Sequence, residues 1–334
     1  MKTTDPSIID FRKKFELTEK VIVISGACGL IGRAFSEAAA QFGATVVCAD
    51  IELANPAAFA QSLSERHERS MMGFALDVSK KEEVIALRDA VLSQYGRIDG
   101  LVCGHQNKTH LKFVPFEQVT EENWDTVVEI NLKGTFLLCQ VIGSHMANQG
   151  KGSIVNIPST YSVVAPNQNL YKGTSLGCPA EYSASKGGVD ALSRYLASYW
   201  ASKNVRVNMI TPHGVWNNHE EQFETNFARF SPLERLSFNH EVAPALIYLL
   251  SDASSYVTVI TCWLKAAGPF GESLFVIEHC NRSELIDCPT PAIFDVDVVV
   301  VDTFGYSSPI DFSIPTFVNV ACFKEQVAPT TKYG

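Results

Sequence analysis

One stretch near the N-terminus limits the fold more than any other: a β-branched run that leads directly into a glycine turn and then a helical pattern. Residues 21–24 read Val-Ile-Val-Ile, the composition of a buried parallel strand. Gly26, Gly29 and Gly32 follow, and residues 33–42 carry a helical pattern. A glycine turn between strand and helix lets the backbone approach a pyrophosphate, and the helix N-terminus offers it free N–H groups. This order predicts a dinucleotide-binding unit.

The strand and helix patterns of this first unit repeat along the chain. Strand patterns recur at residues 44–49, 71–76, 98–103, 152–157 and 205–210. Helical patterns lie between or after them, at residues 80–95, 121–148, 182–203 and 241–250. Alternating strands and helices form parallel sheets, because each helix crosses over to return the chain to the same edge. The chain is therefore predicted to be an α/β protein with a Rossmann-like, doubly wound parallel sheet in a three-layer α/β/α arrangement.

An acidic residue ends the second predicted strand. Asp50 lies roughly 20 residues past the glycines, where a carboxylate can accept hydrogen bonds from a ribose 2′-hydroxyl and would repel a 2′-phosphate. The position favours NAD over NADP as the cofactor. The alternative is that Asp50 is a turn residue at a strand end.

Composition excludes several other classes of protein. The 334 residues are 46% hydrophobic and 19% charged, which suits a globular protein with a sizeable core. The net charge of −9 argues against nucleic acid or an anionic membrane as a partner. The nine cysteines are scattered without C-x-x-C or zinc spacing, so we expect no metal site and reduced thiols in a cytoplasmic protein. No signal peptide and no membrane-spanning apolar run are recognised.

A tyrosine and a lysine lie four residues apart within the predicted helix at 182–203. Tyr182 and Lys186 therefore share one helix face. A cation held close to a phenol lowers the phenol pKa from about 10 toward the range of a general base. Such a tyrosine can exchange a proton with an oxygen while a cofactor carries the hydride. The alternative for an isolated pair of this kind is a solvated helix face.

Taken together, these motifs resemble the short-chain dehydrogenase/reductase family over about residues 17–258. The resemblance implies that Tyr182 is the catalytic acid/base, that Ser159 stabilises the substrate oxygen, and that Thr160 is a weaker alternative for that serine. It further implies that Asn131 supports a proton relay and that Lys186 tunes the tyrosine and binds the nicotinamide ribose. The implied cofactor contacts are Gly26, Cys28, Gly29, Leu30, Ile31, Gly32, Asp50, Ile51, Asp77, Val78, Gly104, Tyr182, Lys186, Pro212, Gly214 and Val215.

Three positions depart from the family pattern. The family usually has Asn-Asn-Ala-Gly after the fourth strand, where this chain has Cys-Gly-His-Gln at residues 103–106. Gly104 keeps the close backbone approach, and His105 is interpreted as a substituted cofactor-loop residue because no orienting partner is evident nearby. Pro158 replaces a serine beside Ser159, and His213 separates Pro212 from the glycine that should contact the nicotinamide amide.

Two segments are predicted to face the substrate. Residues 160–181 form a longer connection than most family members carry, and they make the chain look most similar to oxidoreductases of flagellin and surface-glycan biosynthesis. Tyr171 and Lys172 are the candidate contacts of this segment, although solvated loop residues are the preferred interpretation. Residues 216–239 are predicted to form a substrate lid. His213 and His219 could bind substrate, with surface loop histidines preferred.

The resemblance breaks after Thr258. The family ends with one more strand and a Gly-Gly-Trp sequence, whereas this chain continues for residues 259–334. A shifted reading frame can be formed from the codon of Val259 onward by joining the third base of each codon to the first two bases of the next codon. With suitable third bases, this frame encodes Asp-Asn-Met-Leu-Val-Glu-Gly-Gly-Trp-Thr-Val-Trp-stop, which is the missing family ending. We therefore hypothesise a frame-shifted tail that removes the last strand. The alternative is a genuine C-terminal extension that forms a small β-rich cap.

These features divide the chain into a lead (residues 1–20), a dehydrogenase domain (21–258) and an atypical tail (259–334). The predicted function is NAD(H)-dependent interconversion of an alcohol and a carbonyl, on a sugar or nucleotide-sugar of glycan biosynthesis. The alternatives are a catalytically idle nucleotide-binding protein and a non-functional gene product. The resemblance implies a small-molecule substrate and a homodimer or homotetramer, whose assembly the tail would weaken.

Overall fold

A parallel sheet forms the centre of the protein. The computed structural model describes residues 9–107 and 114–264, which belong to one compact unit, Met1–Ser273. Within these residues the sheet has seven strands in the order β3-β2-β1-β4-β5-β6-β7, and every pair of neighbours is parallel. The strands are β1 Val21–Ser25, β2 Thr45–Asp50, β3 Met72–Ala75, β4 Gly100–Cys103, β5 Gly152–Asn156, β6 Val205–Pro212 and β7 Thr261–Leu264. The predicted α/β fold is confirmed.

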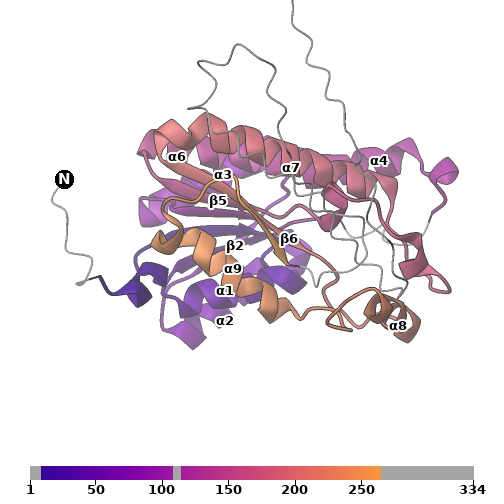
Figure 1. Ribbon diagram of the computed structural model, residues 1–334. Coiled ribbons are helices and arrows are strands. Elements are labelled where there is room, and N and C mark those ends of the chain that lie inside the picture. The colour runs from indigo at the N-terminus through magenta and orange to yellow at the C-terminus, as the bar shows by residue number, and fades with distance from the viewer. Residues whose placement is uncertain (1–8, 108–113, 265–334) are drawn as a thin grey trace, which may run out of the picture. The chain divides into compact units, whose positions relative to one another are not determined.

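Helices cover both faces of the sheet (Figure 1). The helices of one face are α1 Leu30–Gln41, α2 Pro56–His67 and α9 Asn239–Leu250, which enclose one apolar core. The helices of the other face are α3 Lys81–Tyr95, α4 Glu121–Val128, α5 Gly134–Leu138, α6 Ser144–Gln149 and α7 Ala180–Trp200. Helix α2 was not predicted, because its apolar positions are few and the helix buries only Pro56, Phe59, Ala60 and Leu63.

The strand order reverses between β1 and β4, and this reversal places the site. β1 pairs with β2 on one side and with β4 on the other, so the loops that leave the carboxyl ends of β1 and β4 diverge. In doubly wound sheets a ligand binds in the crevice beyond these ends. The central strands β1, β4 and β5 are buried along their whole length, as Ile22, Ile24 and Leu101 show with 0% exposure. The β-branched and aliphatic composition that identified the strands therefore reflects their burial.

The long helical region predicted over 121–148 is interrupted twice. Two π-helical segments, Glu129–Lys133 and Cys139–Gly143, separate α4, α5 and α6. The combined segment Glu121–Gln149 is long and apolar enough by composition to cross a membrane, but 56% of its most apolar window is buried inside the protein. The core helix of a globular domain meets the same criterion. π turns are rare and concentrate at functional sites. The segment Glu129–Lys133 contains Asn131, a predicted site residue, and is therefore a candidate part of the site.

The ends of the domain pack against its centre. Leu17, in the predicted lead, is fully buried, and its N–H donates to Phe42 O at 2.7 Å. At the other end, Thr261–Leu264 forms β7 and pairs with Met209–Pro212 of β6. The expectation that the last strand is lost after Thr258 is therefore wrong, because these four residues keep enough apolar and β-branched character to extend the sheet. The remainder of the tail, 265–334, lies outside the described residues.

Candidate active site

The glycine turn between β1 and α1 is shaped by two close backbone contacts. Gly26 has φ +70°, and a Cβ there would lie 2.7 Å from the backbone of His105. A Cβ on Gly32 would lie only 2.0 Å from the carbonyl oxygen of Gly26, so α1 begins directly against the turn. Neither position accepts a larger residue without movement. The turn therefore presents bare backbone together with the N-terminus of α1, whose first residues are Leu30 and Ile31. A dinucleotide pyrophosphate requires both features.

The carboxylate of Asp50 lies beside this turn. Its Oδ2 accepts the Cys28 N–H at 2.8 Å, and its Oδ1 accepts the Ile51 N–H at 2.8 Å. The hydrogen bond to Cys28 joins the end of β2 to the glycine turn and fixes the acid where the adenine ribose is expected. Ile51, the next residue, is 55% exposed. The contact with Ile51 is one that a turn residue at a strand end also makes, whereas the contact with Cys28 ties Asp50 to the glycine turn, and Asp50 remains a proposed ribose contact.

Asp77 and Val78 follow β3 at the same edge of the sheet. Both Ser79 N–H and Ser79 Oγ donate to Asp77 Oδ1, at 3.0 and 2.7 Å. Burial acts to raise the pKa of Asp77, but hydrogen bonds from Ser79 and Lys80 outweigh it and hold the pKa below its ordinary value. Val78 packs under the helical region, since a Cβ on Gly134 would lie 2.6 Å from its Cγ2. Asp77 and Val78 remain proposed adenine contacts.

Ser159, Tyr182 and Lys186 come together at the ends of β5 and α7. Ser159, on the connection after β5, is 6% exposed, and its hydroxyl hydrogen-bonds the Tyr182 phenol. Lys186 Nζ lies 5.9 Å from the centroid of the Tyr182 ring and donates to Ile157 O at 2.7 Å. The tyrosine and lysine thus share one helix face that is turned toward the sheet, and the alternative of a solvated face is wrong.

The predicted pKa effect in this trio is wrong in sign. Burial raises the pKa of Tyr182 to about 12, and the hydrogen bond from Ser159 opposes this only in part. Burial lowers the pKa of Lys186 to about 8. The lysine therefore does not lower the phenol pKa in this arrangement, because both groups lose water and each favours its neutral form. The tyrosine is poised as a proton donor.

Asn131 lies in the first π-helical segment and bridges two parts of the site. The residue is 1% exposed; its Oδ1 accepts the Asn107 N–H at 2.8 Å, and its Nδ2 donates to Ser185 Oγ at 3.2 Å. Thr135 Oγ1 donates to the Asn131 carbonyl at 2.8 Å. The side chain thus joins the loop after β4 to the helix that carries Tyr182. Asn131 is therefore a buried bridging residue and not a solvated group on the helix surface.

The loop after β4 differs from its prediction at His105. Gly104 makes the expected close approach, since a Cβ there would lie 3.0 Å from Ser25 O. His105, however, has orienting partners: its Nδ1 lies 2.7 Å from Ser25 Oγ and its Nε2 3.1 Å from Ile130 O. The expectation that no orienting partner is nearby is wrong, because the π turn brings the Ile130 carbonyl to the ring. Burial lowers the pKa of His105 to about 3, so the ring is neutral and does not act as a base at ordinary pH.

The loop after β6 is packed beneath the predicted lid. Pro212 ends β6, and a Cβ on Gly214 would lie 2.4 Å from both Phe227 and Leu236, which belong to the lid. Val215 pairs with Ser237 at the return of the lid. The lid contains helix α8, Glu221–Arg229. Pro212, Gly214 and Val215 therefore lie at the carboxyl end of β6, where they remain proposed nicotinamide contacts.

Both histidines of this region are less exposed than expected. The His213 ring lies 4.9 Å from Phe227, and the His219 ring lies 4.9 Å from Phe223, measured between ring centroids. Both residues lie outside helices and strands and are half-buried, so they are loop histidines that pack against the lid helix and keep part of their surface exposed. Helix α8 supplies both aromatic partners, and the sequence showed only a polar, aromatic stretch there.

The connection between Ser159 and Tyr182 carries two phenols that face each other. The hydroxyls of Tyr161 and Tyr171 lie 2.9 Å apart. Burial raises the pKa of both phenols, and Tyr182 adds to this effect in each. Tyr171 also stacks on Phe223 of α8 with centroids 5.8 Å apart, so its interpretation as a solvated residue is wrong, whereas Lys172 is exposed. Tyr161 was missed, although its place two residues after Ser159 was the available signal.

The polar groups beside the glycine turn are suited to a dinucleotide. Within residues 9–107 and 114–264, no group of three or more His, Cys, Asp or Glu side chains is arranged to hold a metal ion. The bare turn at Gly26 and Gly32, with Asp50 beside it, matches the shape and polarity of a nicotinamide dinucleotide. The Tyr182 group lies at the carboxyl edge of β5, on the other side of β4 from the turn.

Comparisons with known proteins agree with this geometry. The family model described as Enoyl-(Acyl carrier protein) reductase, a branch of the short-chain dehydrogenases, matches residues 26–263. The chain is a short-chain dehydrogenase/reductase. Members of this family are oxidoreductases that act on alcohol and carbonyl groups with a nicotinamide cofactor, and the chain is an enzyme of that class.

Individual relatives act on small hydroxylated molecules. The chain is 34% identical to D-threitol dehydrogenase of Mycolicibacterium smegmatis, over 75% of this chain and 92% of the relative. It is 32% identical to NAD-dependent glycerol dehydrogenase of Listeria innocua, over 74% and 93%. A crystal structure of gluconate 5-dehydrogenase from Burkholderia cenocepacia with NADP and tartrate superposes with a TM-score of 0.67 at 25% identity, over 76% of this chain and 96% of that one.

The predicted similarity to glycan-biosynthesis oxidoreductases is only partly confirmed. Post-translational flagellin modification protein A of Campylobacter coli is a relative at 27% identity, over 72% of this chain and 95% of that protein. The threitol and glycerol dehydrogenases are more similar. The long connection 160–181 suggested glycan enzymes because of its length. Sequence identity, however, is calculated over about 250 residues, and this connection is only a small part of them.

Proposed function

We propose that this short-chain dehydrogenase catalyses the NAD-linked interconversion of a secondary alcohol and a ketone in a small polyol or sugar. The hydrogen-bonded pair Ser159–Tyr182, with Lys186 on the same helix face, carries this proposal. When bound, the nicotinamide cofactor supplies or accepts the hydride. The protein then has to hold the reacting oxygen and move one proton, and these three side chains are suited to both tasks.

Each side chain of the trio has a separate task. The Tyr182 phenol, with a pKa raised to about 12, is protonated at neutral pH and donates its proton to a carbonyl oxygen in the reductive direction. Ser159 hydrogen-bonds the same oxygen and stabilises the negative charge that develops there. Lys186 binds the ribose of the cofactor, and its charge then favours the phenolate that alcohol oxidation needs. Asn131 holds the proton relay behind the lysine.

We propose NAD rather than NADP as the cofactor. Asp50 supports this choice, because its carboxylate is fixed by the Cys28 and Ile51 N–H groups where a 2′-phosphate would have to lie. The glycerol dehydrogenase relative is NAD-dependent, whereas the gluconate 5-dehydrogenase structure contains NADP. The carboxylate beside the ribose position is the feature of this chain that favours the first.

The phenols of the 160–181 connection support a hydroxylated substrate. Tyr161 and Tyr171 place two neutral hydroxyls near Tyr182, which adds to the rise in the pKa of each. Tyr171 packs with Phe223 and Phe227 of the lid helix, and Tyr161 meets the edge of the His213 ring with centroids 6.3 Å apart. A site that offers hydroxyl groups inside an apolar wall favours a substrate whose own hydroxyls can satisfy them. A free polyol or sugar fits, and a nucleotide-sugar of glycan biosynthesis remains the larger candidate.

The proposal is tested by turnover and cofactor binding together. Wild type and Tyr182→Phe are assayed with NAD on D-threitol, glycerol, L-fucose, gluconate and nucleotide-sugars, and NADH binding is followed by fluorescence. We expect one of these substrates to be oxidised, and the variant to bind NADH normally while losing about 10²–10⁴-fold in kcat. NADH binding without turnover in either protein would instead establish the idle nucleotide-binding alternative.

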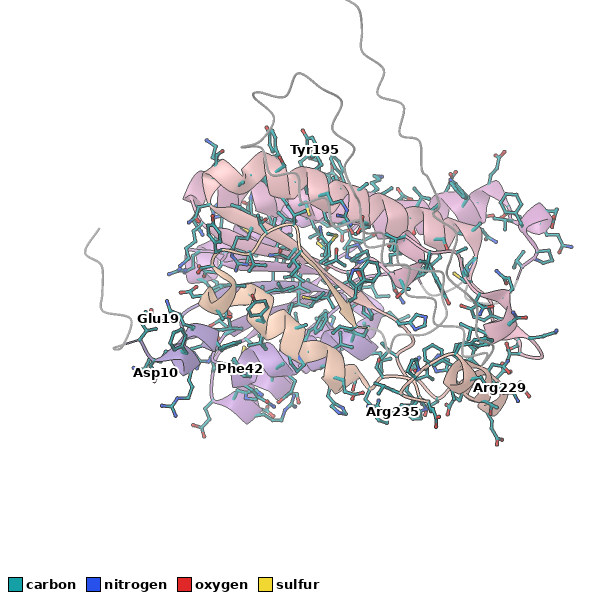
Figure 2. All side chains as sticks on the ribbon, viewed as in Figure 1. Asp10, Glu19, Phe42, Tyr195, Arg229 and Arg235 are labelled. Carbon is teal, nitrogen blue, oxygen red and sulfur yellow. The ribbon has the colours of Figure 1, made fainter. Side chains whose placement is uncertain are left out.

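We further propose a cytoplasmic homodimer or homotetramer. The six cysteines among the described residues are all free, as in a reducing compartment. Helix α7 carries an exposed aromatic pair, Tyr195 and Tyr199, each 63% exposed and stacked at 5.6 Å, and Figure 2 shows Tyr195 on the outer side of that helix. Trp124 and Phe136, on α4 and α5, are also exposed. An apolar surface of this kind favours a second copy as its partner.

We also propose that the reading frame changes after Thr258. The alternative frame permits the family ending, and relatives that are covered over 92–94% of their own length account for only 72–75% of this chain. Sequencing the gene and its transcript across codon 258 tests the proposal. A single intact frame in close relatives, with the same tail, would refute it in favour of a genuine extension.

A further inference from the structure

The loop after β4 carries a buried histidine that the proposed reaction does not use. His105 is 8% exposed, and both ring nitrogens have partners in Ser25 Oγ and Ile130 O. Because a carbonyl oxygen can only accept, Nε2 carries the proton and donates to Ile130 O. Nδ1 is then an acceptor, and the Ser25 hydroxyl is shared between Nδ1 at 2.7 Å and Val102 O at 3.2 Å. The tautomer is thereby fixed, and the ring links the end of β1 to the helical region that begins with α4.

The carbonyl bound by His105 belongs to a turn of π-helix. In the segment Glu129–Lys133 the Gly134 N–H donates to Glu129 O, five residues back. In an α-helix this N–H would donate to Ile130 O, four residues back. The histidine therefore supplies Ile130 O with a donor in place of the α-helical one, and so favours the π turn over the α-helix at this point.

The space for the ring comes from Gly134. A Cβ on this glycine would lie 3.0 Å from His105 Nε2 and 2.6 Å from Val78 Cγ2. A side chain there would displace the imidazole from the Ile130 carbonyl. The histidine and the glycine thus form a matched pair across the interface between the β4 loop and the helix.

The π turn sets the position of Asn131. Asn131 Nδ2 donates to Ser185 Oγ at 3.2 Å, and Ser185 Oγ donates to the Tyr182 carbonyl at 2.9 Å. A continuous series of hydrogen bonds therefore runs from Ser25 through His105, the π turn and Asn131 to the turn of α7 that carries Tyr182. Replacing the π turn by α-helix would rotate Asn131 relative to Ser185, because the two helix types differ by one residue per closed ring.

We propose that His105 is a positioning residue, which selects the π turn through Ile130 O and thereby holds Asn131 in register with Tyr182. The kinetic part of this inference rests on the proposed function, whereas the structural part does not. Through these hydrogen bonds, His105 links the glycine turn at the end of β1 to the turn of α7 that carries Tyr182.

Two variants of similar polarity separate the two hydrogen bonds of His105. In His105→Gln the amide nitrogen reaches as far as Nε2 and can still donate to Ile130 O. In His105→Asn the amide reaches only as far as Nδ1, so the Ser25 contact is kept and the Ile130 contact is lost. Amide hydrogen exchange of peptides covering residues 129–135, NADH affinity by fluorescence, and kcat and KM for D-threitol oxidation are measured for both variants and wild type.

We expect His105→Asn to exchange faster within residues 129–135 and to lose about 10–100-fold in kcat, with NADH affinity and KM close to wild type. His105→Gln should restore both the slow exchange and kcat. Equal behaviour of the two variants, or losses spread evenly over NADH affinity, KM and kcat, would overturn the proposal. If wild type does not oxidise D-threitol, the proposed substrate class is at fault, and the exchange comparison still decides the role of His105.

Discussion

The substitution Gly32→Ala tests whether the cofactor turn depends on close packing of α1. An alanine Cβ would lie 2.0 Å from Gly26 O and 2.9 Å from the carbonyl carbon of Ala27. Relaxed C···O contacts lie near 3.3–3.6 Å, so the first turn of α1 has to move away by more than about 1 Å. The obstacle is backbone, which no rotamer change can relieve.

The expected magnitude differs between stability and binding. Overpacking costs about 1–3 kcal/mol, of which the better helix propensity of alanine returns about 1 kcal/mol, so the free energy of unfolding falls by about 0–2 kcal/mol. Binding suffers more, because the moved N–H groups lose the equivalent of one hydrogen bond to a charged pyrophosphate, worth about 1.5–3 kcal/mol. We therefore expect the NADH Kd to rise by about 10–100-fold.

The assay is a fluorescence titration with NADH, with thermal unfolding measured on the same samples. Gly187→Ala is the matched control, since it is a helical glycine of α7 whose added Cβ would meet only Ser162 O, at 3.7 Å. The control should bind NADH as wild type does. If Gly32→Ala also binds NADH with wild-type affinity, the close approach of α1 to Gly26 does not shape the cofactor site.

Two further predictions concern charge. Asp50→Asn keeps an acceptor for the Cys28 N–H but removes the negative charge that would repel a 2′-phosphate. The ratio of NADPH affinity to NADH affinity should therefore rise by about tenfold in fluorescence titrations. An unchanged ratio would contradict the proposed role of Asp50. Lys186 has a pKa lowered to about 8 from 10.5, so between these values the unfolded chain binds more protons and stability rises with pH. Relative to Lys186→Met, urea unfolding should show wild type gaining about 3 kcal/mol from pH 8 to 10.5, and a flat difference would refute the burial of a charge-bearing lysine.

The sequence was sufficient for the parts of the fold that periodicity and glycines determine. β1 and the turn at Gly26 were recognisable because a buried parallel strand needs β-branched residues and the turn needs backbone without side chains. The helix α7 and its Tyr182–Lys186 face followed from the four-residue spacing. Such features are local, so a single stretch of sequence contains the whole signal.

Other features could not be predicted because they depend on contacts between distant segments. The pKa of Tyr182 was predicted to fall, since spacing reveals the neighbouring cation but not the burial that dominates. The π turn at Asn131 and the partners of His105 arise only when the β4 loop meets the helix. β7 formed where a change of sequence after Thr258 suggested its loss, because a strand at the edge of a sheet requires little more than four compatible residues.

The amide of Asn226 on α8 has a consequence for engineering substrate preference. It donates to the carbonyls of both Leu170 and Lys172, at 3.1 and 2.9 Å, and so fastens the lid helix to the connection that carries Tyr161 and Tyr171. If the connection alone were grafted into another dehydrogenase, the carbonyls of Leu170 and Lys172 would lose their hydrogen-bond donor. If the lid helix alone were grafted, the amide of Asn226 would lose both of its acceptors. In this chain the connection and the lid helix should therefore be exchanged together when substrate preference is engineered.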